Sequence, residues 1–95
     1  MKEAPGNPAA GKGGPVEVDF STLILSLATG ALINLGFAPD PVTKKTQKNI
    51  ELARQNIEIL SLLEQKTKGN LTGDENKLLE NLLAETRLRF VEASR

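Results

Sequence analysis

The sequence predicts an all-α fold in which an apolar first helix is followed by an antiparallel pair of helices. One observation is an uncharged, strongly apolar stretch from Phe20 to Gly36. Another is the spacing of apolar residues by three and four across 47–68, which is the period of an amphipathic helix. The segment Thr72-Gly73-Asp74-Glu75 is a capping box that opens a further helix. We therefore expect a three-helix arrangement, with helices at about 21–36, 47–68 and 73–92, completed by homo-oligomerisation.

The expected first helix is apolar on nearly every side. It begins at Ser21 or Asp19; with Ser21 as N-cap, Phe20 and Leu25 form a hydrophobic staple across the cap. Gly36 suits the left-handed residue that ends a helix, and the proline-rich segment after it prevents continuation. The apolar residues that surround the helix axis are Leu23, Ile24, Leu25, Leu27, Leu32, Ile33 and Leu35. A helix of this kind is buried on all sides, so it needs cover from other helices.

The expected second helix has two apolar rows and a clear end. The main row consists of Ile50, Ala53, Ile57 and Leu60, and the adjoining row of Leu52, Ile59 and Leu63. Lys66 and Lys68 fall in the last turn, where they complement the helix dipole, and Gly69 provides the stop.

The expected third helix follows so closely that the two must form a hairpin. Its apolar face consists of Leu78, Leu79, Leu82, Leu83, Phe90 and Val91. Glu85 and Arg89 are spaced for an ion pair along it. The loop before it comprises only about Gly69 to Leu71, and so short a connection makes neighbouring helices antiparallel.

One helical domain at 18–95 follows an N-terminal tail at 1–17. The first fifteen residues contain three prolines and four glycines and no large apolar residue after Met1. Such a composition cannot form a core, so we expect the tail to be disordered.

Composition excludes several classes of function. The 95 residues carry 12 Lys and Arg against 12 Asp and Glu, so the electrostatic attraction that dominates non-specific nucleic-acid binding is missing. The chain has no Cys, which removes thiolate metal sites and thiol nucleophiles. It also has no His, the commonest general base and metal ligand. We expect a protein that is not an enzyme and that uses no cofactor and no metal.

The apolar stretch raises the question of a membrane span or a signal peptide. A signal peptide has a basic region ahead of its apolar part, whereas here Glu17 and Asp19 come first. The stretch also contains Ser, Thr, Asn and Gly residues, and no Lys or Arg cluster flanks it to set an orientation. These features argue against the membrane and favour a cytoplasmic protein.

Small side chains recur every four residues along the first helix, at Thr22, Ser26, Gly30 and Asn34. Small residues at this spacing let a second helix backbone approach closely. The sequence therefore predicts a homodimer or higher homo-oligomer, because two covering helices cannot shield a helix that is apolar all round. The residues proposed for this interface are Leu23, Ser26, Leu27, Gly30, Ile33 and Asn34. In the alternative interpretation, the row faces the chain's own second and third helices.

Other patterns have ordinary explanations. The carboxylates lack the His partners of a di-iron bundle, and 70–81 lacks the ligand pattern of an EF-hand, so they form a solvated face. The segment that contains Lys44, Lys45 and Lys48 lacks the aromatic side chains on which nucleic-acid binders stack bases. The Gly-Lys-Gly-Gly run at 11–14 lacks the spacing of a P-loop.

Several segments together resemble a known family. They are Phe20–Thr29, Leu35-Gly36, Pro39-Asp40-Pro41, the turn Lys66–Thr72, and Leu78–Leu83. In these the chain resembles the bacterial family Domain of Unknown Function 1844, over about Val18 to Ala93. The resemblance implies a small bacterial helical protein and implies no activity.

The sequence thus favours a small non-catalytic helical protein that self-associates and serves as a binding or structural module. Two alternatives use the same helix: membrane association, or a chaperone-like adapter that engages a different protein. The sequence leaves open the biological process, the order of the oligomer and the identity of any protein partner.

Overall fold

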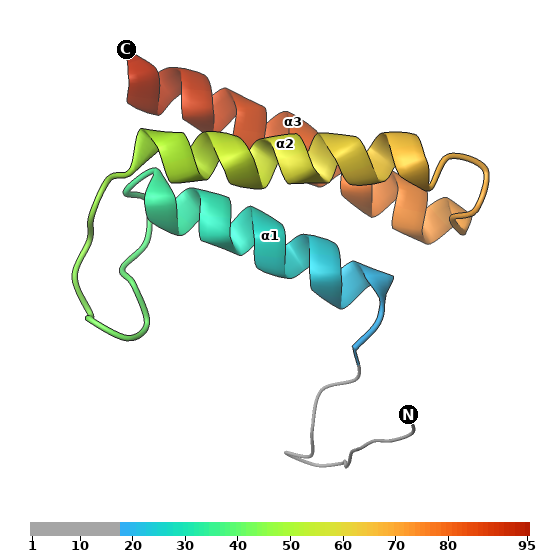
Figure 1. Ribbon diagram of the computed structural model, residues 1–95, viewed down its shortest axis with the longest axis horizontal. Helices are drawn as coiled ribbons and strands as arrows, with labels where there is room; N and C mark the ends of the chain where they lie inside the picture. Colours follow the sequence, from blue (N-terminus) through green and yellow to red (C-terminus); the bar gives the residue numbers. More distant parts are fainter. Residues whose placement is uncertain (1–17) are drawn as a thin grey trace.

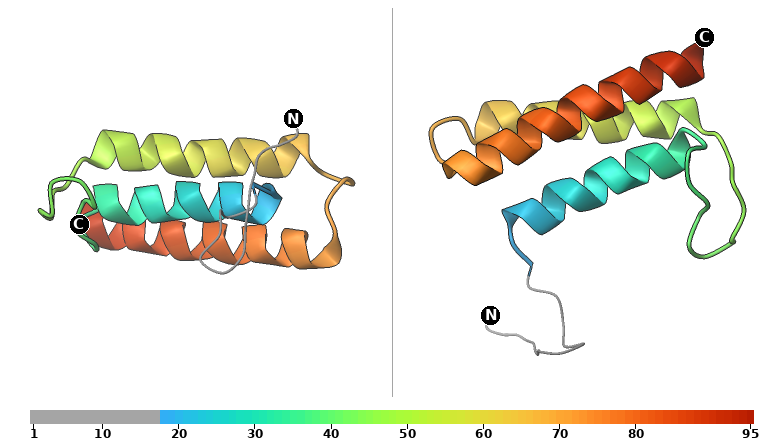
Figure 2. Two further views of the ribbon diagram at one scale, coloured as in Figure 1. Left: turned by 90° about the horizontal axis from the view of Figure 1, so that it is seen from below. Right: turned by 180° about the vertical axis from the view of Figure 1, so that it is seen from behind.

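The computed structural model describes residues 18–95, which form three helices and contain no strand. The helices are α1 (Phe20–Asn34), α2 (Ile50–Lys66) and α3 (Gly73–Ser94). Helices α2 and α3 lie side by side as an antiparallel hairpin, and α1 lies along the groove between them (Figures 1 and 2). The predicted all-α, three-helix arrangement is confirmed. The predicted tail at 1–17 lies outside the described residues.

Helix α1 begins two residues earlier than a cap at Ser21 requires and follows the other predicted start, Asp19. Asp19 is the N-cap, because its carboxylate accepts the backbone N–H of Thr22 at 2.8 Å. Phe20 is therefore the first helical residue and packs against the core. The staple prediction is wrong, since an aspartate oxygen takes the cap two positions before Ser21.

The end of α1 is fixed by a glycine in the left-handed conformation. Gly36 has φ +89°. Its N–H bonds the carbonyl of Ile33 at 3.1 Å, and the N–H of Phe37 bonds the carbonyl of Leu32 at 3.0 Å. This is the hydrogen-bond pattern of a Schellman motif, and it confirms the predicted role of Gly36. The last helical residue is Asn34, two residues before the expected end.

Helix α2 begins at Ile50, three residues after the expected start at Gln47. The reason is Asn49, whose side chain caps the helix by accepting the N–H of Leu52 at 3.1 Å. The backbone N–H of Asn49 also bonds the carbonyl of Asn34 at 2.6 Å, which ties the start of α2 to the end of α1. At the other end the helix stops at Lys66, and Gly69 follows with φ +87°.

Helix α3 opens with the predicted capping box. The hydroxyl of Thr72 accepts the N–H of Glu75 at 3.1 Å, and the Glu75 carboxylate accepts the N–H of Thr72 at 2.9 Å. Towards its end, Arg89 pairs with Glu85, as predicted, and also with Glu92, both at 2.9 Å. The hydrogen bond that Arg89 donates to Glu92, together with the charge of Glu85, raises the pKa of the Arg89 guanidinium.

The core lies where the three helices meet. Its buried members are Ile24, Ala28, Leu60, Leu79 and Leu83. Thr86 is also fully buried, and its hydroxyl donates to the carbonyl of Leu82 at 2.8 Å within its own helix. Val91, which was predicted to face the core, is 55% exposed. It lines the hollow of the α2–α3 seam with Phe90, Arg54 and Arg87.

Candidate interaction surface

Helix α1 was predicted to be buried on all sides, but it is buried on one side only. Ile24, Ala28, Ala31 and Leu35 are buried. The opposite side, the outer face, points away from both α2 and α3 (Figure 2). It forms a shallow groove lined by Thr22, Leu25, Ser26, Thr29, Gly30 and Ile33.

The outer face is uncharged although it is open. No Asp, Glu, Lys or Arg occurs anywhere in α1. Leu23 and Leu25 remain 44% and 45% exposed at its two edges. A surface helix of a globular protein ordinarily carries charged residues on its solvent side. This face therefore has the chemistry of a surface that another element covers.

Two contacts fix how α1 sits on α2. The Asn56 side chain reaches across and donates its Nδ2–H to the carbonyl of Leu27 at 3.3 Å. It can do so because Gly30 has no side chain: a Cβ there would lie 2.5 Å from Asn56 Nδ2. Together with the Asn49–Asn34 bond, this pairing runs the two helices antiparallel.

The register of these contacts extends the surface onto α2. Moving one helical turn along each helix from the Gly30–Asn56 contact brings Ile59 level with Ser26, and Leu52 level with Ile33. Leu52, Ile59 and Leu62 are 44%, 43% and 51% exposed. We call the outer face of α1 with these three side chains the α1–α2 face. The sequence marked Leu52 and Ile59 as an apolar row, but not as part of an interface.

The six residues predicted for the interface are divided between two sides of α1. Leu23 and Ser26 are exposed, and Ile33 lines the outer groove. Leu27 and Asn34 instead meet α2, through the Asn56 and Asn49 hydrogen bonds. Gly30 lies at the boundary, where it lines the outer groove and also makes the close approach to Asn56. For this part of the row the alternative interpretation, packing within the chain, describes the structure. An interface role for Leu23, Ser26 and Ile33 stays a prediction.

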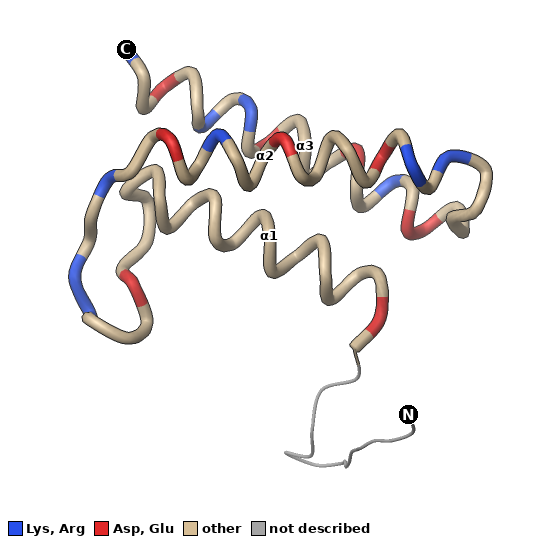
Figure 3. The backbone as a smooth tube through the Cα atoms, viewed as in Figure 1, with Lys and Arg blue, Asp and Glu red and all other residues tan. Residues whose placement is uncertain are grey.

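Charges lie at the two ends of α1 and not along it (Figure 3). Asp19 stands at the N-terminal end, and the hydrogen bond from the Thr22 backbone N–H lowers the pKa of its carboxyl. At the other end, the connector between α1 and α2 carries Asp40, Lys44, Lys45 and Lys48. The Lys48 ammonium donates to the carbonyl of Ala93 at 3.3 Å and so points to the end of α3.

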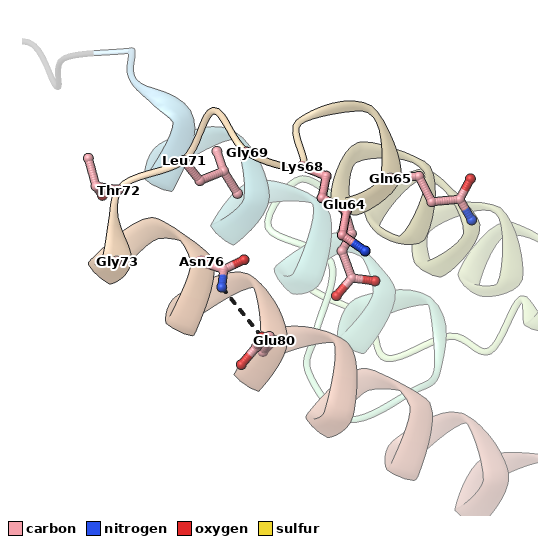
Figure 4. Close-up of a pocket in the computed structure, with 9 residues that line it drawn as sticks. All are labelled: Glu64, Gln65, Lys68, Gly69, Leu71, Thr72, Gly73, Asn76 and Glu80. Atoms are coloured by element: carbon pink, nitrogen blue, oxygen red, sulfur yellow. Dashed lines mark hydrogen bonds between the residues drawn. The ribbon is translucent and has the colours of Figure 1, made fainter.

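A second hollow lies at the turn between α2 and α3 (Figure 4). Two of its polar residues are engaged: Thr72 belongs to the capping box, and Asn76 donates to Glu80 at 3.5 Å. In residues 18–95, no three Asp or Glu side chains lie close enough together to hold a metal ion.

A third, apolar hollow lies in the seam between α2 and α3. It is lined by Ile57, Phe90 and Val91, with Arg54 and Arg87 at its edge and Glu58 beside them. Arg54 pairs with Glu51 at 3.3 Å, and Arg87 donates to the Ser61 hydroxyl at 3.4 Å. The Arg54 bond lies along α2, whereas the Arg87 bond crosses the seam from α3 to α2.

The helices of the described part are too short or too polar to cross a bilayer.

Comparison with known proteins gives one result. No curated protein and no solved structure was found to match the chain. A family model matches residues 17–92, which include all three helices except the last two residues of α3. The resemblance inferred from the sequence is thereby confirmed. The chain belongs to the family described as Domain of unknown function (DUF1844).

Proposed function

We propose that this protein is a non-catalytic binding module that self-associates through the α1–α2 face. The observation that supports this most directly is the exposure of an uncharged helix face where a surface helix would carry charge. The module acts in the cytoplasm.

Energetics favours cover for this face. Leaving apolar surface in water costs roughly 25 cal/mol for each Å². Leu23 and Leu25 lie on α1, and Leu52, Ile59 and Leu62 on the neighbouring helix, and all five stay about half exposed. Large exposed apolar surfaces mark sites of protein association. A second copy presents the same uncharged surface, and two-fold dimers are the commonest closed assembly.

The available chemistry supports a binding role over catalysis. The full sequence holds no His and no Cys, which removes the most frequent general base and the most reactive nucleophile. The carboxylates Glu51, Glu85 and Glu92 pair with arginines on their own helices. Paired catalytic carboxylates would converge in a cleft, whereas these lie along exposed helix surfaces.

The test is the oligomeric state of the purified chain, measured by sedimentation velocity or light scattering at micromolar concentration. We expect a dimer or larger species. Ser26→Glu places a charge on the outer face and should shift the protein toward monomer. Gln65→Glu, at an exposed position on α2, adds the same charge elsewhere and should leave the assembly intact.

Two results would contradict the proposal. One is a stable monomer at micromolar concentration. The other is an assembly that Ser26→Glu and Gln65→Glu affect equally. Gly30→Leu is unsuitable as a probe, because the added side chain collides with Asn56 inside the chain and would disturb the monomer itself.

A further inference from the structure

We infer that two copies pair through their α1 outer faces in antiparallel orientation, so that the Asp19 end of each α1 lies beside the lysine-bearing connector of the other. This inference rests on the self-association proposed above and adds its geometry. The argument uses the distribution of charge, the position of the connector, and the size of the side chains along the outer face.

The connector projects on the same side of the molecule as the outer face. In Figure 1 it descends from the C-terminal end of α1, away from α2 and α3, and in the view from below in Figure 2 it stands beyond that end of the helix. A second helix lying along the outer face therefore has one of its ends directed at this connector.

The charge of the connector selects which end that is. Three lysines and one aspartate, Asp40, give it a net charge of +2, counted as three minus one. The Asp40 carboxylate is already engaged, accepting the N–H of Val42 at 2.7 Å and of Thr43 at 3.2 Å. Lys44 and Lys45 are exposed on the part of the connector that projects farthest (Figure 3).

Antiparallel pairing brings opposite charges together at both ends of the interface. The N-terminal end of one α1, with the Asp19 carboxylate, then faces the Lys44-Lys45 pair of the partner, and the two-fold axis repeats the contact. Parallel pairing would instead place two lysine connectors side by side and two aspartates side by side. Like charges within about 10 Å repel appreciably at moderate ionic strength, so the parallel arrangement is disfavoured.

Side-chain size permits close contact at the centre of such a pair. Ser26 and Thr29 lie on the outer face on either side of Leu27, the midpoint of the fifteen-residue helix. A two-fold axis crossing α1 near this midpoint sets small side chains against small side chains, which lets the two backbones approach. The same axis sets Thr22 of one copy near Ile33 of the other.

The area required shows that α1 does not act alone. A fifteen-residue helix is about 22 Å long, and its face is about 10 Å wide, so the stripe covers only a few hundred Å². A standard stable interface buries about 800 Å² on each partner. The second copy must therefore also cover apolar side chains outside α1, and Leu52, Ile59 and Leu62 of α2 are exposed.

Cysteine cross-linking of the full-length chain distinguishes the two orientations, because the natural sequence has no Cys. Thr22→Cys and Ile33→Cys lie eleven residues apart on α1, which is about 16 Å along the helix and beyond the reach of a disulfide. With antiparallel pairing, neither variant cross-links to itself, whereas an equal mixture gives a covalent dimer. A short bis-maleimide reagent still joins the two cysteines if the two α1 helices are shifted by one turn relative to each other.

Each outcome has a distinct meaning. Efficient self-linking of either single variant, with no gain on mixing, would show parallel pairing and overturn this inference while leaving self-association in place. A monomer in sedimentation velocity, with no cross-link in any sample, would overturn the proposed function as well. Circular dichroism on each variant checks that the helices are retained.

Charge reversal provides an independent measurement. Lys44→Glu with Lys45→Glu should weaken the dimer by roughly tenfold, because two repeated rim contacts become repulsive. Arg54→Glu with Arg87→Glu reverses two exposed charges in the α2–α3 seam, outside the α1–α2 face, and should leave the dissociation constant within about twofold. Equal effects of the two double variants would overturn the antiparallel assignment.

Discussion

The contact between Gly30 and Asn56 makes a quantitative prediction about the stability of the fold. Gly30→Ala has two opposing effects. In the interior of a helix, replacing Gly by Ala stabilises by about 0.8–1.0 kcal/mol, because the unfolded chain loses conformational freedom. The new Cβ would lie 2.5 Å from Asn56 Nδ2, so the Asn56 side chain must turn away and give up its bond to the carbonyl of Leu27.

The cost of that lost bond sets the balance. A hydrogen bond between neutral groups contributes about 0.5–1.5 kcal/mol of net stability. The two terms nearly cancel, so Gly30→Ala alone should change the free energy of unfolding by less than about 0.5 kcal/mol. In an Asn56→Ala background there is neither a collision nor a bond to lose. There Gly30→Ala should stabilise by the full ~1 kcal/mol, giving a coupling energy of about 1 kcal/mol.

Urea unfolding followed by circular dichroism measures all four members of this cycle. The samples are compared at one protein concentration, because self-association stabilises the folded chain by mass action. Gly73→Ala is the comparison without a collision: Gly73 is the first residue of α3, and a Cβ there would meet nothing within 4 Å. Its effect shows what the loss of a glycine does when no side chain has to move. If Gly30→Ala stabilised by about 1 kcal/mol in both backgrounds, Asn56 would not lie over Gly30 and the register of α1 on α2 would be wrong.

Three further predictions concern the caps, the core and pH. Asn49→Ala should cost about 1 kcal/mol by removing the cap of α2, whereas Asn49→Ser should retain most of that stability; equal losses would argue against the cap. Leu60→Ala, at a fully buried position, should destabilise by about 2–5 kcal/mol. Leu62→Ala, at a half-exposed position one turn from Ile59, should have a far smaller effect on the monomer and should weaken association; a large loss of monomer stability would contradict its position. The lowered pKa of Asp19 means that its contribution to stability is complete above the ordinary value of 3.8 and is lost as the pH falls through the lower folded-state value. Asp19→Asn keeps a capping oxygen, so the stability difference between wild type and variant should shrink in that acidic range, and a difference independent of pH would refute the role of the carboxylate.

Features determined by neighbours in the chain could be predicted from the sequence. The stops at Gly36 and Gly69 and the capping box of Thr72 and Glu75 all depend on residues within a few positions of one another. The start of α2 could not be placed in this way. Asn49 caps that helix while its N–H bonds the carbonyl of Asn34, and this second contact joins segments fifteen positions apart.

Buried Thr86 shows a different limit of the sequence pattern. A threonine among leucines is normally assigned to the polar side of a helix. Here the hydroxyl bonds the carbonyl of Leu82 in the previous turn, so the side chain needs no partner outside its own helix and can enter the core. Val91 shows the opposite case: it was predicted to face the core because it is apolar and continues the expected face, yet it is 55% exposed and lines the α2–α3 seam.

Only part of the predicted interface lies on an open surface. The reason is the path that the row of small residues follows around α1. Successive residues of an α-helix are about 100° apart, so a step of four residues advances the direction by about 40°. From Thr22 to Asn34 the row therefore turns by about 120°, and it passes from the outer face to the side that meets α2. Gly30 lies at the edge of that side and leaves room for Asn56. The contact of Asn56 with α1 is a polar one, so the spacing of apolar residues does not predict it. Because this contact fixes the rotation of α1 about its axis, it also decides which residues remain outside. The surface available to a second copy is thus set by a bond inside the first, and association should fail whenever that register is lost.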